Sequence, residues 1–124
     1  MKITFLGKDS TRHQEARRSL RRLRVISEPV TEYIRFEWLD AAELVKAGED
    51  VRWLPRQRAS GLLLPGNDLW CFDAETVVFT YLSGEGEVQG YELAADPGLV
   101  RQVVTAFEAA WSAATPHGEY DLRT

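Results

Sequence analysis

The sequence contains few of the residues from which cross-links and metal sites are built. There is one cysteine, Cys71, and there are two histidines, His13 and His117, among 124 residues. A single cysteine excludes a disulfide within the chain and gives no sign of an oxidising compartment. Because the histidines lie in opposite charged ends of the chain, and one cysteine cannot form a thiolate cluster, we expect no metal site and no cofactor.

Long hydrophobic runs and a phosphate-binding loop are also missing. No apolar stretch approaches the roughly 18 residues that cross a membrane, and the apolar patch in MKITFLGKDS is too short for the central region of a signal peptide. We therefore expect a cytoplasmic protein without membrane contact. The stretch SGEGE, residues 83–87, is interpreted as a hairpin turn, because its acidic side chains would repel phosphate.

Charge is distributed unevenly along the chain, which has 15 basic and 19 acidic residues. Residues 1–26 hold eight basic and two acidic residues, a balance of +6, and the remainder has a balance of −10. A basic front end could contact nucleic acid, with Arg17, Arg18, Arg21 and Arg22 as the candidate residues. The interpretation that we favour is that these arginines are solvated, or paired within the chain or between copies.

What the sequence does contain is a regular succession of strand and helix patterns. They predict an α/β (α+β) protein with a mixed sheet, built from a strand–helix–strand unit, antiparallel hairpins and a C-terminal helix. We interpret residues 21–116 as a single globular domain. Residues 1–20 are expected to form a basic N-terminal arm, and residues 117–124 a loose tail.

The N-terminal part gives the weakest patterns. Ile3, Phe5 and Leu6 form a short apolar segment, which we expect to be an edge strand. Residues 9–19 have a helix-compatible composition but almost no apolar face. The following sequence, RRLRVIS (21–27), is typical of a strand with one buried face.

The first helix has the clearest pattern. Ser27 is the expected N-cap, and Pro29 falls in the first turn. Apolar residues then recur at spacings of three and four, and Gly48 takes the C-terminal glycine position. DVRWLP (50–55) is expected to be a strand, so that the two strands around the helix form a parallel unit.

After Pro55 the pattern changes to strands joined by short turns. Residues 62–64 form a short run expected to be buried, and two hairpins follow, with turns at Ala74-Glu75 and at residues 83–86. Asp96 and Pro97 predict the start of a final helix. The predicted core contains Val25, Ile34, Trp38, Val51, Trp53, Leu63, Phe72, Val78, Phe79, Phe107 and Trp111.

Arg56 and Arg58 are the most interesting candidates for a binding site. They follow the second strand of the parallel unit, where open α/β sheets tend to place ligands. Two guanidinium groups at this spacing could hold a carboxylate or phosphate, and with Asp68 they form our candidate anion- or partner-binding site. The alternative, which we favour, is that the arginines pair with Asp50, Asp68 or Asp73 and hold the loop.

Covalent catalysis finds little support in the sequence. Ser60 and Cys71 have no histidine near them in sequence, and Cys71 is better interpreted as a buried structural thiol. The segment RASGLLLP loosely resembles half of a phospholipase-D-like domain, in which a histidine and a lysine precede an apolar run. Arg58 and Ser60 stand in those two places here, so this resemblance implies at most a non-catalytic relative.

Four segments resemble the domain of unknown function numbered 6879, which is common in actinobacteria: RVISEPVTEYIRFEW, AGEDVRWLPR, RASGLLLPGNDLWCFD and AFEAAWSAATPHGEY. The resemblance runs from about Arg22 to Tyr120. Members are typically encoded beside helix-turn-helix regulators in Streptomyces and its relatives, which implies a regulatory role. They typically have a longer N-terminal portion, so this chain resembles a short member whose truncated edge a partner or second copy completes.

These observations leave three functions open. The first is a non-catalytic regulatory module that binds a protein partner, such as a DNA-binding regulator, and forms a homodimer. The second is a hydrolase or transferase that holds an anionic substrate with Arg56 and Arg58. The third is direct nucleic-acid contact through the basic N-terminus. We favour the first.

Overall fold

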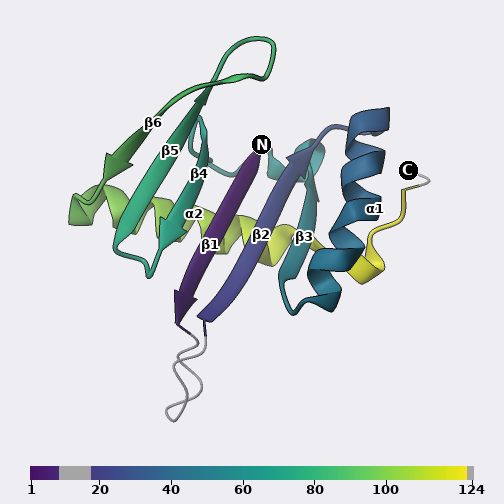
Figure 1. Cartoon of the computed structure of the whole chain (residues 1–124), viewed down its shortest axis with the longest axis horizontal. Helices are drawn as coiled ribbons and strands as arrows, with labels where there is room; N and C mark the ends of the chain where they lie inside the picture. The colour runs from purple at the N-terminus through teal and green to yellow at the C-terminus, as the bar shows by residue number, and fades with distance from the viewer. Residues whose placement is uncertain (9–17, 123–124) are drawn as a thin grey trace.

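The structure is a computed structural model that describes residues 1–8 and 18–122 (Figure 1). Within these residues, seven strands form one mixed sheet in the order β6-β5-β4-β1-β2-β3-β7. The elements, in chain order, are β1 (Lys2–Lys8), β2 (Arg18–Ile26), α1 (Glu32–Lys46), β3 (Asp50–Pro55), the 3₁₀ helix η1 (Arg56–Ala59), β4 (Asp68–Phe72), β5 (Thr76–Leu82), β6 (Val88–Ala94), α2 (Pro97–Ala113), β7 (Thr115–Pro116) and the 3₁₀ helix η2 (His117–Glu119). The α+β class and the mixed sheet are as the sequence predicts.

β1 lies in the middle of the sheet, so the prediction of an edge strand is wrong. It pairs antiparallel with β2 and parallel with β4, and its Ile3 and Phe5 side chains are buried on the face of the sheet that α2 covers. The basic arm predicted for residues 1–20 is thus part of the sheet where the structure describes it. The helix considered for residues 9–19 lies outside the described residues, except for its last two, which begin β2.

The strand–helix–strand unit is confirmed, because β2 and β3 run parallel and α1 connects them. The helix begins later than predicted, however. Its N-cap is Thr31, whose hydroxyl accepts the Ile34 N–H at 3.2 Å, and not Ser27. Gly48 follows the helix with a φ of 99°, a conformation that favours glycine, so this glycine ends the helix as predicted.

β4, β5 and β6 form the predicted antiparallel hairpins. The first turn has Asp73 and Ala74 at φ of 53° and 54°, and the Glu75 N–H donates to the Phe72 carbonyl at 3.0 Å. The short run at residues 62–64 is not a buried strand. Leu63 is 92% exposed, because the chain leaves η1 in an irregular connection that crosses from β3 to β4.

α2 covers one face of the sheet along its length (Figure 1). Asp96 caps it by accepting the Leu99 N–H at 3.0 Å, with Pro97 as first residue, as predicted. Its buried side packs on β1, β2, β4 and β5, and the ring of Phe107 stacks on Phe5 at a centroid distance of 3.8 Å. Cys71 lies in this core with no exposed surface, and burial raises the pKa of its thiol.

α1 and the C-terminal residues cover the β2–β3 end of the other face. The indole N–H of Trp53 donates to Nδ1 of His117 at 3.0 Å, and the ring of Trp38 lies 5.0 Å from that imidazole. Tyr120 is buried against Trp53 and donates to Oε2 of Glu28 at 2.5 Å. The loose tail predicted from residue 117 is therefore wrong for η2 and Tyr120.

The predicted core is partly confirmed. Five of its members are buried: Val25, Val51, Trp53, Phe107 and Trp111. Five others are only half-buried: Ile34, Trp38, Phe72, Val78 and Phe79. Leu63 is exposed, and β5 places Val77 rather than Val78 beneath α2. Across the described ranges, neither helix is long and apolar enough to span a membrane.

Candidate functional site

Arg56 and Arg58 extend from η1 to different parts of the fold. Nε of Arg56 donates to the hydroxyl of Ser27 at 3.1 Å. Arg58 donates to the carbonyl of Ala113 at 3.0 Å and to the hydroxyl of Thr115 at 2.7 Å, so it holds the C-terminal end of α2. These partners differ from the aspartates considered from the sequence.

Asp68, the third residue of that candidate site, accepts the backbone N–H of Lys2 at 3.1 Å and joins β4 to β1. Each of the three side chains therefore has a role in holding adjacent elements together. Anion or partner binding at Arg56, Arg58 and Asp68 remains a prediction.

The candidate nucleic-acid residues that the structure describes are paired with carboxylates. Arg21 makes two hydrogen bonds to Glu108, at 2.8 and 2.9 Å, and its guanidinium lies 4.7 Å from the Phe107 ring centroid. Nε of Arg22 donates to Glu49 at 2.7 Å. Arg17 and the side chain of Arg18 lie outside the described part of the chain.

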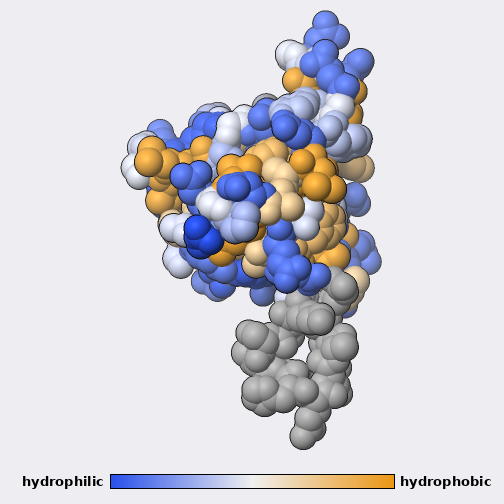
Figure 2. Space-filling model, turned by 90° about the vertical axis from the view of Figure 1, so that its left-hand side faces the viewer, coloured by the Kyte–Doolittle hydropathy of each residue, from blue (hydrophilic) through white to orange (hydrophobic). Residues whose placement is uncertain are grey.

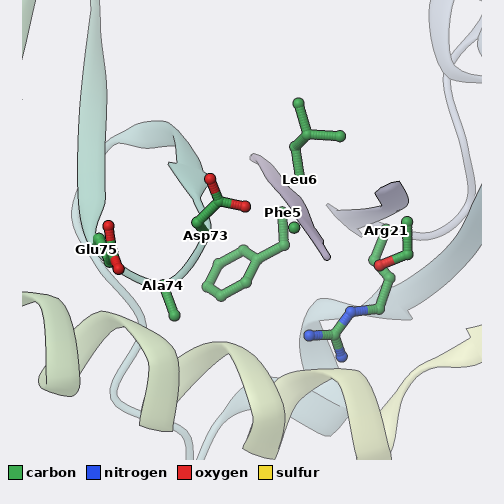
Figure 3. Close-up of a pocket in the computed structure, with 8 residues that line it drawn as sticks. Phe5, Leu6, Arg21, Asp73, Ala74 and Glu75 are labelled. Atoms are coloured by element: carbon green, nitrogen blue, oxygen red, sulfur yellow. The ribbon is translucent and has the colours of Figure 1, made fainter. Parts of the chain in front are cut away.

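A pocket of about 380 Å³ lies beside Arg21, at the end of β1 and the β4–β5 turn (Figure 3). Figure 3 shows the carboxylates of Asp73 and Glu75 on one side of the Phe5 ring and the Arg21 guanidinium on the other. The guanidinium is already bound to Glu108, so it is not available to clamp an anion in this pocket. Among the described residues, no group of histidine, cysteine and acidic side chains is placed to hold a metal ion.

A larger groove, of about 1290 Å³, separates α2 from β5, β6 and the connection before β4. Leu64, Phe79, Leu99 and Ala106 contribute apolar walls. At its β6 side the hydroxyl of Tyr81 donates to Glu92, and this hydrogen bond raises the pKa of Tyr81. Of the lining residues that the structure describes, none is a serine, cysteine, histidine or lysine, and Tyr81 with Glu92 is a hydrogen-bonded pair of titratable side chains.

Exposed apolar side chains also occupy the face of β4, β5 and β6 opposite α2, which we call the open sheet face. Leu69 and Cys71 of β4 point into the core under α2, so Trp70 and Phe72 point to the opposite side. The same alternation places Val78 and Leu93 beside Trp70. The open sheet face comprises Trp70, Phe72, Val78, Thr80, Leu82, Val88, Tyr91 and Leu93.

Strand pairing aligns this face into rows across the sheet. One row runs from Arg22 through Thr4, Trp70 and Val78 to Leu93. At its inner end the guanidinium of Arg22 lies 5.5 Å from the Trp70 ring centroid, and these two long side chains flank Thr4, which is only 5% exposed. At its outer end Leu93 is 68% exposed. The row thus passes from a covered to an uncovered region.

Four large apolar side chains of β5 and β6 are exposed on this face: Leu82 at 42%, Val88 at 53%, and Tyr91 and Leu93 each at 68%. Figure 2, which views the molecule from the β6 side, shows hydrophobic residues gathered at this end. Trp70 and Phe72 stack on each other at 5.9 Å and belong to neither of the two buried cores. Contiguous apolar surface of this kind marks interaction sites.

α1 forms a wall along the inner border of the open sheet face. Glu37 of α1 accepts from Arg24 at 2.5 Å and lies 3.2 Å from Nζ of Lys2, so this side of the helix faces β1. Tyr33, one helical turn before Glu37 on the same side, is 61% exposed. The open sheet face therefore extends from α1 on one side to the edge strand β6 on the other.

The sequence did not reveal this surface. LWCF in β4 is apolar on both of its faces, which is typical of a strand buried on both sides. The feature of the sequence that could have indicated this surface is β6, which contains apolar residues although the predicted core includes none of them.

The family model described as Domain of unknown function (DUF6879) matches residues 6–121. The match begins before Arg22, where the resemblance in the sequence starts, and it includes the end of β1. No curated protein and no solved structure matches the chain.

Proposed function

We propose that this chain, which belongs to the DUF6879 family, is a non-catalytic interaction module whose open sheet face binds a helix of a partner protein. The observation that supports the proposal is that half of one face of the sheet is not covered by a helix. One face of the sheet is covered by α2, whereas on the other face α1 covers only the β2–β3 end, within the described residues. Exposed apolar side chains occupy the uncovered half.

A helix suits this surface because helices and sheets bury their apolar sides by packing in layers. Neighbouring strands are about 4.8 Å apart and a helix is about 10 Å across, so β1, β4, β5 and β6 leave room for at least one helix beside α1. Trp70, near the centre of the open sheet face, would contribute most to binding of the partner helix, since large aromatic residues in central positions dominate interface energies.

The nature of the partner is drawn from the family resemblance. Members of this family are expected beside helix-turn-helix regulators in actinobacteria such as Streptomyces, and such regulators are helical and cytoplasmic. We therefore propose that the partner is the helix-turn-helix regulator encoded beside this chain, and that the module acts in regulation.

The two rival functions have less support in the geometry. An anion-binding enzyme would need the guanidinium of Arg58, which already donates to Ala113 and Thr115. Of the four arginines predicted for nucleic-acid contact, Arg21 and Arg22 are paired with Glu108 and Glu49, whereas Arg17 and the side chain of Arg18 lie outside the described residues.

Calorimetric titration of the regulator into the purified chain tests the proposal. We expect binding, and Trp70→Ala should weaken it by roughly 30-fold, the effect of losing a central anchor worth about 2 kcal/mol. Leu63→Ala is the matched control, because Leu63 is 92% exposed on a different surface and its truncation should leave the affinity unchanged. Thermal unfolding of both variants must show that Trp70→Ala remains folded.

Two results would contradict the proposal. One is the absence of any heat of binding with the regulator. The other is an equal loss of affinity in Trp70→Ala and Leu63→Ala, which would place the contact elsewhere.

A further inference from the structure

The C-terminal segment, residues 117–122, closes the smaller of the two hydrophobic cores. The ring of Tyr120, which is 7% exposed, stacks on that of Trp53 at a centroid distance of 6.0 Å. Leu122 packs against the same core. Trp53 has no exposed surface, although β3 lies beside the short strand that ends the sheet. The segment is therefore part of the cover over Trp53.

Little backbone pairing holds this segment to the sheet. β7, which precedes it, pairs with β3 over only two residues, Thr115 and Pro116. The segment itself contains the 3₁₀ helix η2 and, within the described residues, no strand. Its attachment therefore depends on side chains. Segments of this kind can open locally while the rest of a protein stays folded.

One of the side-chain contacts that attach the segment is incompatible with a proton. The indole N–H of Trp53 donates to Nδ1 of His117 at 3.0 Å. An indole is a donor only, and a protonated imidazole has two N–H groups and no acceptor. Protonation of His117 thus sets two donors against each other in a partly buried contact, and the hydrogen bond is lost.

The surroundings of His117 disfavour its charged form. The Trp38 ring of α1 and the Trp53 ring of β3 lie 5.0 and 6.2 Å from the imidazole. Burial among these groups lowers the pKa of His117 from its ordinary value of 6.5. In a detached segment the imidazole is solvated and titrates at its ordinary pKa. The proton therefore binds the detached state more strongly than the attached one.

Within the described residues, no carboxylate forms a hydrogen bond or an ion pair with His117. Arg24 of β2 lies 5.4 Å from the Trp53 ring and is paired with Glu37. Arg52 of β3 points to the opposite face of the sheet, where it lies 4.5 Å from the Trp111 ring. The carboxylates of the segment and its contacts are those of Glu28, Glu119 and Asp121.

We infer that the C-terminal segment is an acid-sensitive switch: when His117 takes up a proton, the segment detaches from β3 and α1 while the sheet and α2 remain folded. Acid favours the detached state below the ordinary pKa of 6.5, by about tenfold per pH unit, until the attached state is protonated as well. Above that value the attached state is favoured by its full amount.

Detachment uncovers the rings of Trp53 and Trp38 at the β3 end of the sheet. The core under α2 keeps all of its members, because none of them belongs to the segment. The switch does not rest on the proposed function, since the open sheet face lies on β4, β5 and β6.

Amide hydrogen exchange of the wild-type chain, measured by NMR from neutral to mildly acidic pH, tests the switch. Protection is expressed relative to an unstructured peptide at the same pH, which removes the intrinsic effect of pH on exchange. The amide of Tyr120, which donates to the carbonyl of His117, should lose about tenfold in protection per pH unit below 6.5. The amide of Phe107 in α2 should keep its protection.

Two variants separate His117 from the groups near it. His117→Asn supplies a carbonyl acceptor that does not titrate, so the protection of Tyr120 should no longer depend on pH. Glu119→Gln is the matched control, because it removes an exposed carboxylate two residues away and should keep the wild-type pH dependence. The indole N–H resonance of Trp53 in the wild type needs no variant, and its shift should follow the titration of the His117 imidazole.

Three results would each overturn the inference. The first is a protection of Tyr120 that acid leaves unchanged. The second is an equal loss of protection at Phe107, which would mean that acid unfolds the whole chain. The third is a Trp53 indole resonance that does not follow the titration of His117.

Discussion

Arg21 of β2 and Glu108 of α2 form a two-point ion pair, with nitrogen–oxygen distances of 2.8 and 2.9 Å. The same guanidinium lies 4.7 Å from the Phe107 ring centroid and 5.5 Å from that of Trp111. Arg21 therefore links β2 to α2 in two ways: its charge pairs with Glu108, and its planar guanidinium packs against the aromatic rings of α2. Arg21, which the sequence suggested for nucleic-acid contact, thus has a structural role in the fold.

Glu108→Gln should lower the free energy of unfolding by about 1 kcal/mol, because the pair is partly exposed and a neutral amide accepts weaker hydrogen bonds from Arg21. The hydrogen bond from Arg21 holds the pKa of Glu108 below its ordinary value of 4.5. The stabilisation is therefore present above pH 4.5 and is lost as the pH falls through the lowered pKa of the folded state. Urea unfolding at a series of pH values measures both effects.

Glu85→Gln provides the control for Glu108→Gln. Glu85 is an exposed acid in the β5–β6 turn, and its removal should change stability by less than about 0.5 kcal/mol. An equal loss in the two variants, or a difference between wild type and Glu108→Gln that is unchanged in strong acid, would show that the charge of Glu108 does not stabilise the fold.

His117 should make the stability of the β3–α1 region sensitive to mild acid. Burial lowers the pKa of His117 from its ordinary value of 6.5, and its Nδ1 accepts the indole N–H of Trp53. The unfolded chain therefore takes up a proton at a higher pH than the folded chain does. Stability is fully present above pH 6.5 and declines as the pH falls below that value, until the folded state is protonated as well.

His117→Asn tests this linkage, because an asparagine carbonyl can replace Nδ1 as an acceptor but does not titrate. The variant should lose less stability than the wild type between neutral and mildly acidic pH, as measured by the midpoint of urea unfolding. Parallel pH dependence in the two proteins would mean that another group is responsible. Near-ultraviolet circular dichroism, which reports the environments of all the aromatic side chains, provides a second readout of the same transition.

Elements with local start and stop signals could be predicted from the sequence, and long-range pairings could not. Asp96 and Pro97 mark the start of α2 because the cap and the first-turn proline act within one turn. At α1 the sequence pattern favoured Ser27 as the cap, whereas the structure uses Thr31, four residues later. The central position of β1 depends on pairing with β4, more than 60 residues away, which no local pattern specifies.

The open sheet face was beyond sequence reasoning for a related reason. A strand such as β4, apolar at both Trp70 and Cys71, predicts burial on both faces. Whether the second face is covered depends on how far α1 extends over the sheet, which is a property of the assembled fold. Charge reasoning was limited in the same way, because Arg22 and Glu49 are 27 residues apart in sequence and meet only across β2 and β3.

Arg58→Ala should lower the free energy of unfolding by about 1–2 kcal/mol, because it removes two hydrogen bonds and leaves the carbonyl of Ala113 without this donor at the end of α2. Arg56→Ala, which removes one hydrogen bond to Ser27, should cost less. Inorganic phosphate should not raise the melting temperature of the wild type more than that of Arg58→Ala. A phosphate-dependent rise that Arg58→Ala abolishes would restore the anion site as the better explanation.

A double-mutant cycle separates the structural role of Arg58 from a general loss of charge. Thr115→Val keeps the shape of the side chain and removes the hydroxyl that accepts from Arg58 at 2.7 Å. If the contact stabilises the fold, the double variant should be less destabilised than the sum of the single variants, by about 0.5–1 kcal/mol. Strict additivity would show that the contact between Arg58 and Thr115 does not stabilise the fold, and urea unfolding of the four proteins distinguishes the two cases.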